Sequence, residues 1–94
     1  MRISTIIAGR QFFIERNKDP FVKKKSGGGY YNGANHIVLN ENLRDEEELE
    51  VLVHESMHAH DMELPEDFVE MLAKDITQAL WDYGYRVEHP ELRI

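Results

Sequence analysis

Residues 45–83 read DEEELEVLVHESMHAHDMELPEDFVEMLAKDITQALWDY, and this stretch decides how the chain folds. Its first part predicts a helix that begins at about Arg44 or Asp45 and ends at about His60. Asp45 and Glu48, three residues apart, form an acidic variant of the capping box at the start of this helix. The first half of the stretch is therefore expected to be a single helix that presents its histidines at helical spacing.

The second half of the stretch predicts another helix after a short connection at residues 61–64. Pro65 is suited to the first position of a helix, and Glu66 and Asp67 favour its positive end. Gly84 ends the helix. An apolar arc at helical spacing marks the packed face: Phe68, Val69, Leu72, Ile76, Ala79, Leu80 and Tyr83. Because the connection is short, the two helices are expected to be antiparallel neighbours.

The residues before this stretch predict β-strands. Residues 3–7 and 11–15 are short, apolar and β-branched or aromatic, with a plausible turn between them. Asn32-Gly33 lies between aromatic and β-branched residues and predicts a tight hairpin. Residues 17–29 are expected to form a loop, and the tail after Gly84 is undecided, with an edge strand at residues 85–87 as one option. Strands followed by two helices predict one α+β domain over residues 1–94.

Composition excludes several classes of function. The net charge of −7 in 94 residues argues against binding to a phosphate backbone, and the basic run at residues 23–25 reads as a solvated loop. The chain has no cysteine, so a disulfide scaffold and a thiolate zinc site are excluded. No apolar run reaches membrane-spanning length, and no secretory segment is recognisable. We expect a cytoplasmic protein that acts on protein rather than on nucleic acid or membrane.

His54-Glu55-Ser56-Met57-His58 is the pattern that points most directly to chemistry. Positions four apart lie on one face of a helix, so the two imidazoles of His54 and His58 are able to chelate one metal ion. The glutamate after the first histidine is placed to act on a water bound to that metal. The pattern predicts a zinc site with Glu55 as general base.

A catalytic zinc needs a third protein ligand, and the sequence offers several. His60 is only two residues from His58 and points to another side of the helix, which makes it a poor choice. Glu66 and Glu70 are four residues apart and share a face of the second helix. The level of the metal along the first helix slightly favours Glu70. The residues alone therefore leave both carboxylates open as ligands.

Residues 28–82, and 45–73 above all, resemble the gluzincin type of zincin metallopeptidase and the small metallopeptidases of phages and mobile elements. In that family a strand region precedes the H-E-x-x-H helix, and the following helix carries Glu-x-x-x-Asp. The resemblance implies that Glu66 binds zinc and that Glu70 orients a histidine. This chain departs from the family pattern in its shorter linker between His58 and Glu66, and in having Glu rather than Asp at position 70.

The expected activity is hydrolysis of peptide bonds by a metal-activated water, with Glu55 passing the proton to the leaving amine. The strand at residues 36–39 is expected to offer its edge to an extended peptide. A donor for the oxyanion is also required, and the sequence leaves five candidates: Tyr31, His36, His60, Tyr83 and Tyr85.

Two other functions are compatible with the same residues. One is a metal-stabilised protein-binding module without turnover, because a small domain has little surface for a substrate cleft. The other is an acidic interaction domain without metal. The sequence fixes neither the substrate nor the oligomeric state.

Overall fold

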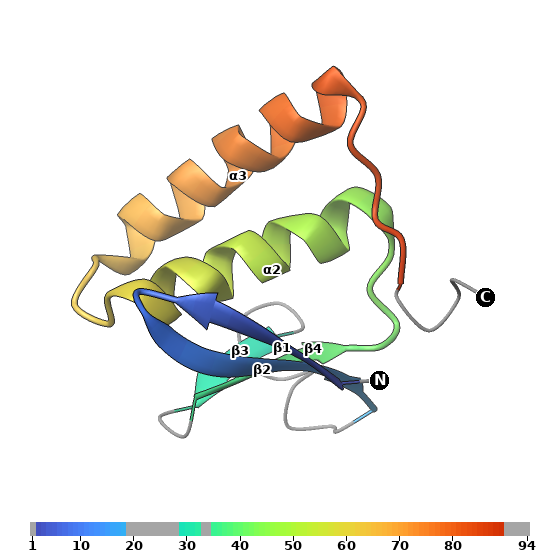
Figure 1. Ribbon diagram of the computed structural model, residues 1–94. Coiled ribbons are helices and arrows are strands. Elements are labelled where there is room, and N and C mark those ends of the chain that lie inside the picture. Colours follow the sequence, from blue (N-terminus) through green and yellow to red (C-terminus); the bar gives the residue numbers. More distant parts are fainter. Residues whose placement is uncertain (1, 19–28, 33–34, 90–94) are drawn as a thin grey trace.

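The computed structural model describes residues 2–18, 29–32 and 35–89, with the side chains of residues 29–32 left aside. Four strands precede two helices, which confirms the α+β class (Figure 1). The strands are β1 (Arg2–Ile7), β2 (Arg10–Asn17), β3 (Gly29–Asn32) and β4 (His36–Asn40), and the helices are α2 (Asp45–His60) and α3 (Glu66–Tyr83). Neither helix in the described ranges is long and apolar enough to cross a membrane.

The strands form one mixed sheet in the order β1-β2-β4-β3. β1 and β2 form the expected antiparallel hairpin, whose turn residues Ala8 and Gly9 both have positive φ, as a tight two-residue hairpin turn requires. β3 and β4 are also antiparallel, as Asn32-Gly33 predicted, although residues 33–34 lie outside the described residues. β2 and β4 pair in parallel, with Ile14 opposite Ile37, and this pairing was not anticipated.

β4 is an inner strand, so the expectation that residues 36–39 offer a free edge is wrong. β4 pairs with β2 on one side and with β3 on the other. Ile37, Val38, Leu39 and Asn40 are all buried, whereas a strand with one solvated face alternates. This run of buried residues agrees with the inner position of β4 in the sheet. The outer strands of the described sheet are β1 and β3.

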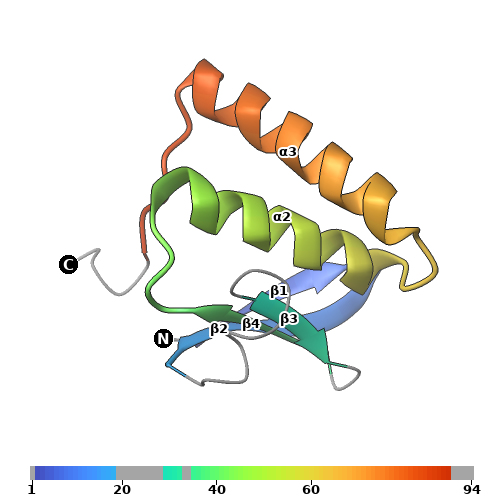
Figure 2. The same ribbon diagram turned by 180° about the vertical axis from the view of Figure 1, so that it is seen from behind.

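The helices form two further layers on one side of the sheet. α2 contacts β1, β3 and β4, and its apolar residues join those of the strands in the core, which contains Phe12, Ile37, Leu39, Leu43, Val51 and Ala59. α3 runs antiparallel to α2 and, among the described elements, packs against α2 alone (Figures 1 and 2). The two helices are therefore the expected antiparallel pair, but only α2 touches the sheet.

This arrangement corrects the predicted packed face of α3. Its buried residues are Val69, Ala73 and Thr77, and of these only Val69 belongs to the predicted apolar arc. Phe68 and Tyr83, which the periodicity placed on the packed face, are exposed. With only one helix to pack against, α3 buries a narrow stripe and leaves the rest of its apolar surface open.

The ends of the helices agree with the predicted bounds to within a residue, but not with the predicted capping box. The N-cap of α2 is Arg44, and no side chain caps the helix. Glu48 does not cap the helix but is buried, and Arg16 Nε and His89 Nε2 each lie 2.8 Å from its carboxylate. Gly84 ends α3 in the left-handed conformation, with φ of 113°. The described tail after Gly84 forms no strand.

Candidate metal centre

His54 and His58 lie one turn apart on α2 and point to the same side of the helix. Their ring centroids are 5.0 Å apart. Both side chains are largely shielded from solvent, with 15% and 17% of their surface exposed. The imidazoles are therefore held close together at the border between the buried and the exposed faces of α2, as their spacing predicted.

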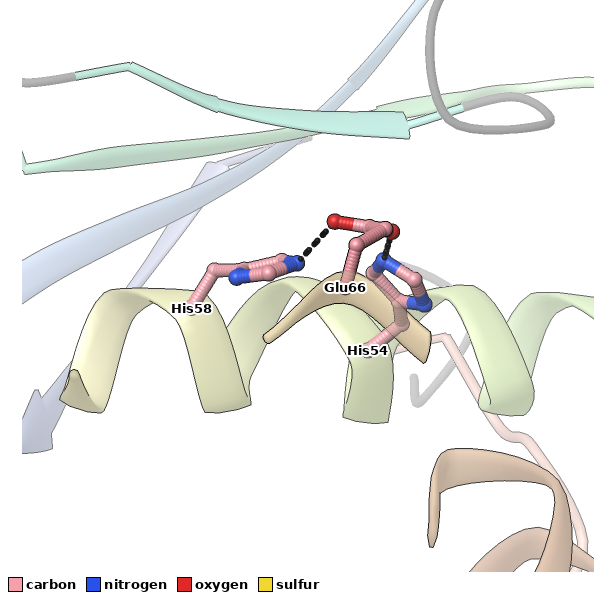
Figure 3. Close-up of side chains that lie close together, drawn as sticks. All are labelled: His54, His58 and Glu66. Carbon is pink, nitrogen blue, oxygen red and sulfur yellow. Dashed lines mark ion pairs between the residues drawn. The ribbon is translucent and has the colours of Figure 1, made fainter. Parts of the chain in front are cut away.

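Glu66, the first residue of α3, places its carboxylate against both rings. Its Oε1 lies 2.7 Å from Nε2 of His54, and its Oε2 lies 2.8 Å from Nε2 of His58 (Figure 3). The carboxylate thus spans the two nitrogens rather than pairing with one of them. One donor atom from each of the three residues falls within 4.8 Å of the other two. Three possible ligands from two helices converge on one point.

The turn between the helices explains how Glu66 reaches the histidines. Asp61 accepts a hydrogen bond from the backbone N–H of Glu63 through its side chain and one from Leu64 through its carbonyl. This local turn reverses the chain within a few residues. Pro65 then takes the N-cap position with φ of −60°, so that Glu66 opens α3 beside the last turns of α2. The sequence predicts the short connection at this point, but it does not reveal the role of the Asp61 side chain.

The arrangement of His54, His58 and Glu66 suits a metal ion better than it suits hydrogen bonds between the three side chains. Although the Glu66 oxygens stand at ion-pair distance, Nε2 of His54 and Nε2 of His58 are both buried and have no hydrogen bond of acceptable geometry. A cation between the three groups would satisfy both nitrogens and neutralise the carboxylate. Two imidazole nitrogens and a carboxylate oxygen are also a ligand set that zinc uses in catalytic sites.

The distances allow such an ion after a small movement. Zinc bonds of about 2.0–2.2 Å place neighbouring ligand atoms of a tetrahedral site roughly 3.3 Å apart. The present separations of 2.7 and 2.8 Å are shorter, so the carboxylate has to withdraw by about half an ångström. Glu66 is 63% exposed at the first position of a helix, where its side chain is free to make that shift.

Glu55 lies next to the histidines but on the sheet-facing side of α2. It belongs to the buried row that includes Val51 and Ala59, and only 2% of its surface is exposed. Glu55 is three positions before His58, which puts the two side chains about 60° apart around the helix. The position adjoins the metal-binding face, as a base acting there requires, and the carboxyl is held within the protein.

The other two proposed ligands lie elsewhere. Glu70 is 58% exposed and pairs with Lys74 at 3.7 Å, one turn further along α3. Its carboxylate is not among the three groups that converge at the candidate centre. His60 is exposed and lines a groove on another side of α2. The structure thus brings together His54, His58 and Glu66, and leaves Glu70 and His60 outside the group.

None of the oxyanion candidates with a described side chain is at the centre. His36 stacks edge-on against Phe13, on the face of the sheet opposite α2. Tyr83 and Tyr85 are exposed and stack on each other at the far end of α3, about 25 Å along the helix axis from Glu66. The side chain of Tyr31 lies outside the described residues. The described side chains therefore do not identify the donor.

Comparisons with known proteins add no relative. No family model matches the chain, and searches of curated proteins and of solved structures find no significant match. The resemblance to gluzincins therefore remains a prediction, which rests on the spacing of His54, Glu55, His58 and Glu66.

Proposed function

We propose that the protein is a zinc-dependent peptidase that hydrolyses peptide bonds at the His54–His58–Glu66 centre. One observation carries the proposal: both oxygens of Glu66 face the buried Nε2 atoms of two histidines that belong to an H-E-x-x-H helix. Glu55, the acidic residue of that motif, lies on the same helix between the two histidines in sequence. The four residues combine a metal-binding group with an adjacent candidate base.

Each residue has a distinct role in this proposal. His54, His58 and Glu66 hold the zinc ion, which when bound supplies Lewis acidity toward a carbonyl oxygen and toward water. Glu55 accepts a proton from the attacking water and delivers it to the leaving amine.

The sheet supports a peptide as the substrate. β3 is an outer strand of the described sheet and contacts α2, the helix that bears the motif. An outer strand has backbone N–H and C=O groups available for an added strand. Residues 36–39 are paired on both sides. In this proposal an extended peptide therefore docks on the backbone of β3 instead.

A metal-stabilised binding module without turnover is the second candidate, and the burial of Glu55 favours it. A general base must reach the water that it deprotonates. The Glu55 carboxyl is 2% exposed and lies on the sheet-facing side of α2. It reaches a water molecule only if the site admits water next to that carboxyl. The two candidates share the metal centre and differ only in the chemistry of Glu55.

Replacing Glu55 separates them. The zinc-loaded protein is incubated with a mixture of internally quenched peptides, and cleavage is followed by fluorescence. Turnover that Glu55→Gln abolishes while zinc content stays unchanged supports the peptidase, because the amide keeps the shape of the carboxyl but accepts no proton. Glu47→Gln, an exposed acidic residue on the same helix, is the matched control and should cleave at the wild-type rate.

Two outcomes contradict the proposal, one the peptidase activity itself and the other the role of Glu55. Zinc-loaded wild type that cleaves no peptide in the mixture leaves the binding module as the function. Cleavage by Glu55→Gln at the wild-type rate rules out the assigned base.

A further inference from the structure

An apolar groove of about 480 Å³ runs between α2 and α3. Leu52, Val53 and Met57 line it from α2, and Phe68 and Leu72 line it from α3. A cavity of this size accommodates several apolar side chains of a ligand. The groove is a second candidate site, and the proposed peptidase activity does not use it.

The groove lies on the opposite side of the helix pair from the metal centre. On α2, His54 and His58 are offset by two residues from Leu52 and Ser56, which line the groove, and two residues correspond to about 200° around a helix. On α3 the same offset separates Glu66 from Phe68. A molecule in the groove therefore leaves the metal centre accessible.

Phe68, which lines this groove, and two nearby methionines in the sequence are exposed large apolar residues. Phe68 is 51% exposed, and Met71, one turn further along the same helix, is 67% exposed. Met62, in the turn between the helices, is 66% exposed. Flexible methionines next to an aromatic residue are typical of surfaces that receive apolar side chains from a partner. No described strand covers this side of α3, because α3 packs only against α2.

The charge around the groove is negative. Most of the 18 acidic residues of the chain lie between positions 45 and 83, and in that part of the sequence Lys74 is the only lysine or arginine. Lys74 pairs with Glu70 on the other side of α3. Glu46 on α2 and Asp75 on α3 lie within two turns of groove-lining residues, and Glu63 lies in the turn. The two helices that form the groove and the turn between them are therefore strongly acidic.

We infer that the groove between α2 and α3 binds a basic amphipathic helix of a partner protein. The apolar face of such a helix fills the groove, and its lysines and arginines meet carboxylates of the two acidic helices. A second copy of this chain would bring like charges together, and an anionic lipid surface would be repelled. Of the partners that have an apolar face, charge complementarity therefore favours a positively charged one.

Peptide binding tests this inference directly. The probe is a fluorescent synthetic helix of about five turns with leucines on one face and lysines elsewhere, and its affinity is measured by anisotropy. We expect Phe68→Ser and Asp75→Lys each to weaken binding by about tenfold. Ile6→Ser, at an exposed apolar residue on β1, is the matched control and should bind like wild type. Leu72→Ser, at another residue that lines the groove, replaces Phe68→Ser if circular dichroism shows that the latter is unfolded.

Three results would overturn the inference. A scrambled peptide of the same composition that binds as tightly as the helix shows attraction by charge alone. Unchanged affinity in the groove variants places the peptide elsewhere. A dimer in sedimentation that Phe68→Ser dissociates makes a second copy the occupant. Zinc content, measured on the same samples, reports separately on the metal centre.

Discussion

Nε2 of His58, in the last turn of α2, lies 2.8 Å from Oε2 of Glu66, the first residue of α3. This contact joins the two helices across the turn that Asp61 builds. It also commits the side chain of Glu66 to the metal-binding face, whereas Glu70 one turn later faces Lys74. In the proposed metal site, the position at which α3 begins therefore favours Glu66 over Glu70 as the third ligand.

Replacing the two carboxylates should affect zinc binding very differently. We expect Glu66→Ala to weaken zinc binding by more than about 100-fold, since the loss of a ligand exceeds the 10–100-fold cost of losing a residue that supports one. Glu70→Ala should bind like wild type, because its carboxylate is exposed and paired with Lys74. A competition titration with a chromogenic chelator measures both. Equal weakening in the two variants would show that Glu70 takes part in the site.

The turn should matter for the metal although it contributes no ligand. Asp61→Ala removes the side-chain acceptor of the Glu63 N–H, which loosens the position of Glu66. We expect about tenfold weaker zinc binding in the same titration. Glu63→Ala, which keeps the backbone N–H and removes an exposed side chain, is the control. If Asp61→Ala binds zinc as wild type does, the turn is held by its backbone alone.

Zinc should stabilise the fold. The ligands come from two helices that otherwise share a narrow interface, so an ion that binds only the folded state adds to its stability. Free zinc at 100 times its dissociation constant contributes about 2.7 kcal/mol, which in a domain of this size raises Tm by roughly 10 °C or more. A chelator should reverse the shift, and His60→Ala should retain it. An unchanged Tm in wild type with excess zinc would show that no ion links the helices.

The buried cluster of Arg16, Glu48 and His89, near the start of α2, should contribute strongly to the stability of the fold. Glu48 is 4% exposed and contacts both Arg16 and His89, so Glu48→Ala removes the buried carboxylate that pairs with Arg16. We expect a loss of about 3–5 kcal/mol in the free energy of unfolding by urea. Glu47→Ala, next to it but exposed, should change that free energy by less than about 0.5 kcal/mol. A loss below about 1 kcal/mol for Glu48→Ala would show that the cluster adds little.

The helices were predictable from the sequence because their signals are local. Pro65 and Gly84 mark the ends of α3, and the spacing of His54 and His58 places both rings on one face. The partner of β4 was not predictable, because a short apolar run does not reveal which strand lies beside it. Glu48 was misread for the same reason: its partners Arg16 and His89 are distant in sequence, and only the folded chain brings them to it.

The most direct test of the metal centre is the zinc content of the purified protein, measured by mass spectrometry on wild type and on the double variant His54→Ala/His58→Ala. We expect about one zinc per chain in wild type and none in the double variant, because removal of both imidazoles leaves Glu66 alone of the three converging groups among the described residues. Circular dichroism checks that the variant still contains its helices. Full zinc content in a folded double variant, or a wild type that binds no zinc at micromolar concentrations, would contradict the assignment of the site.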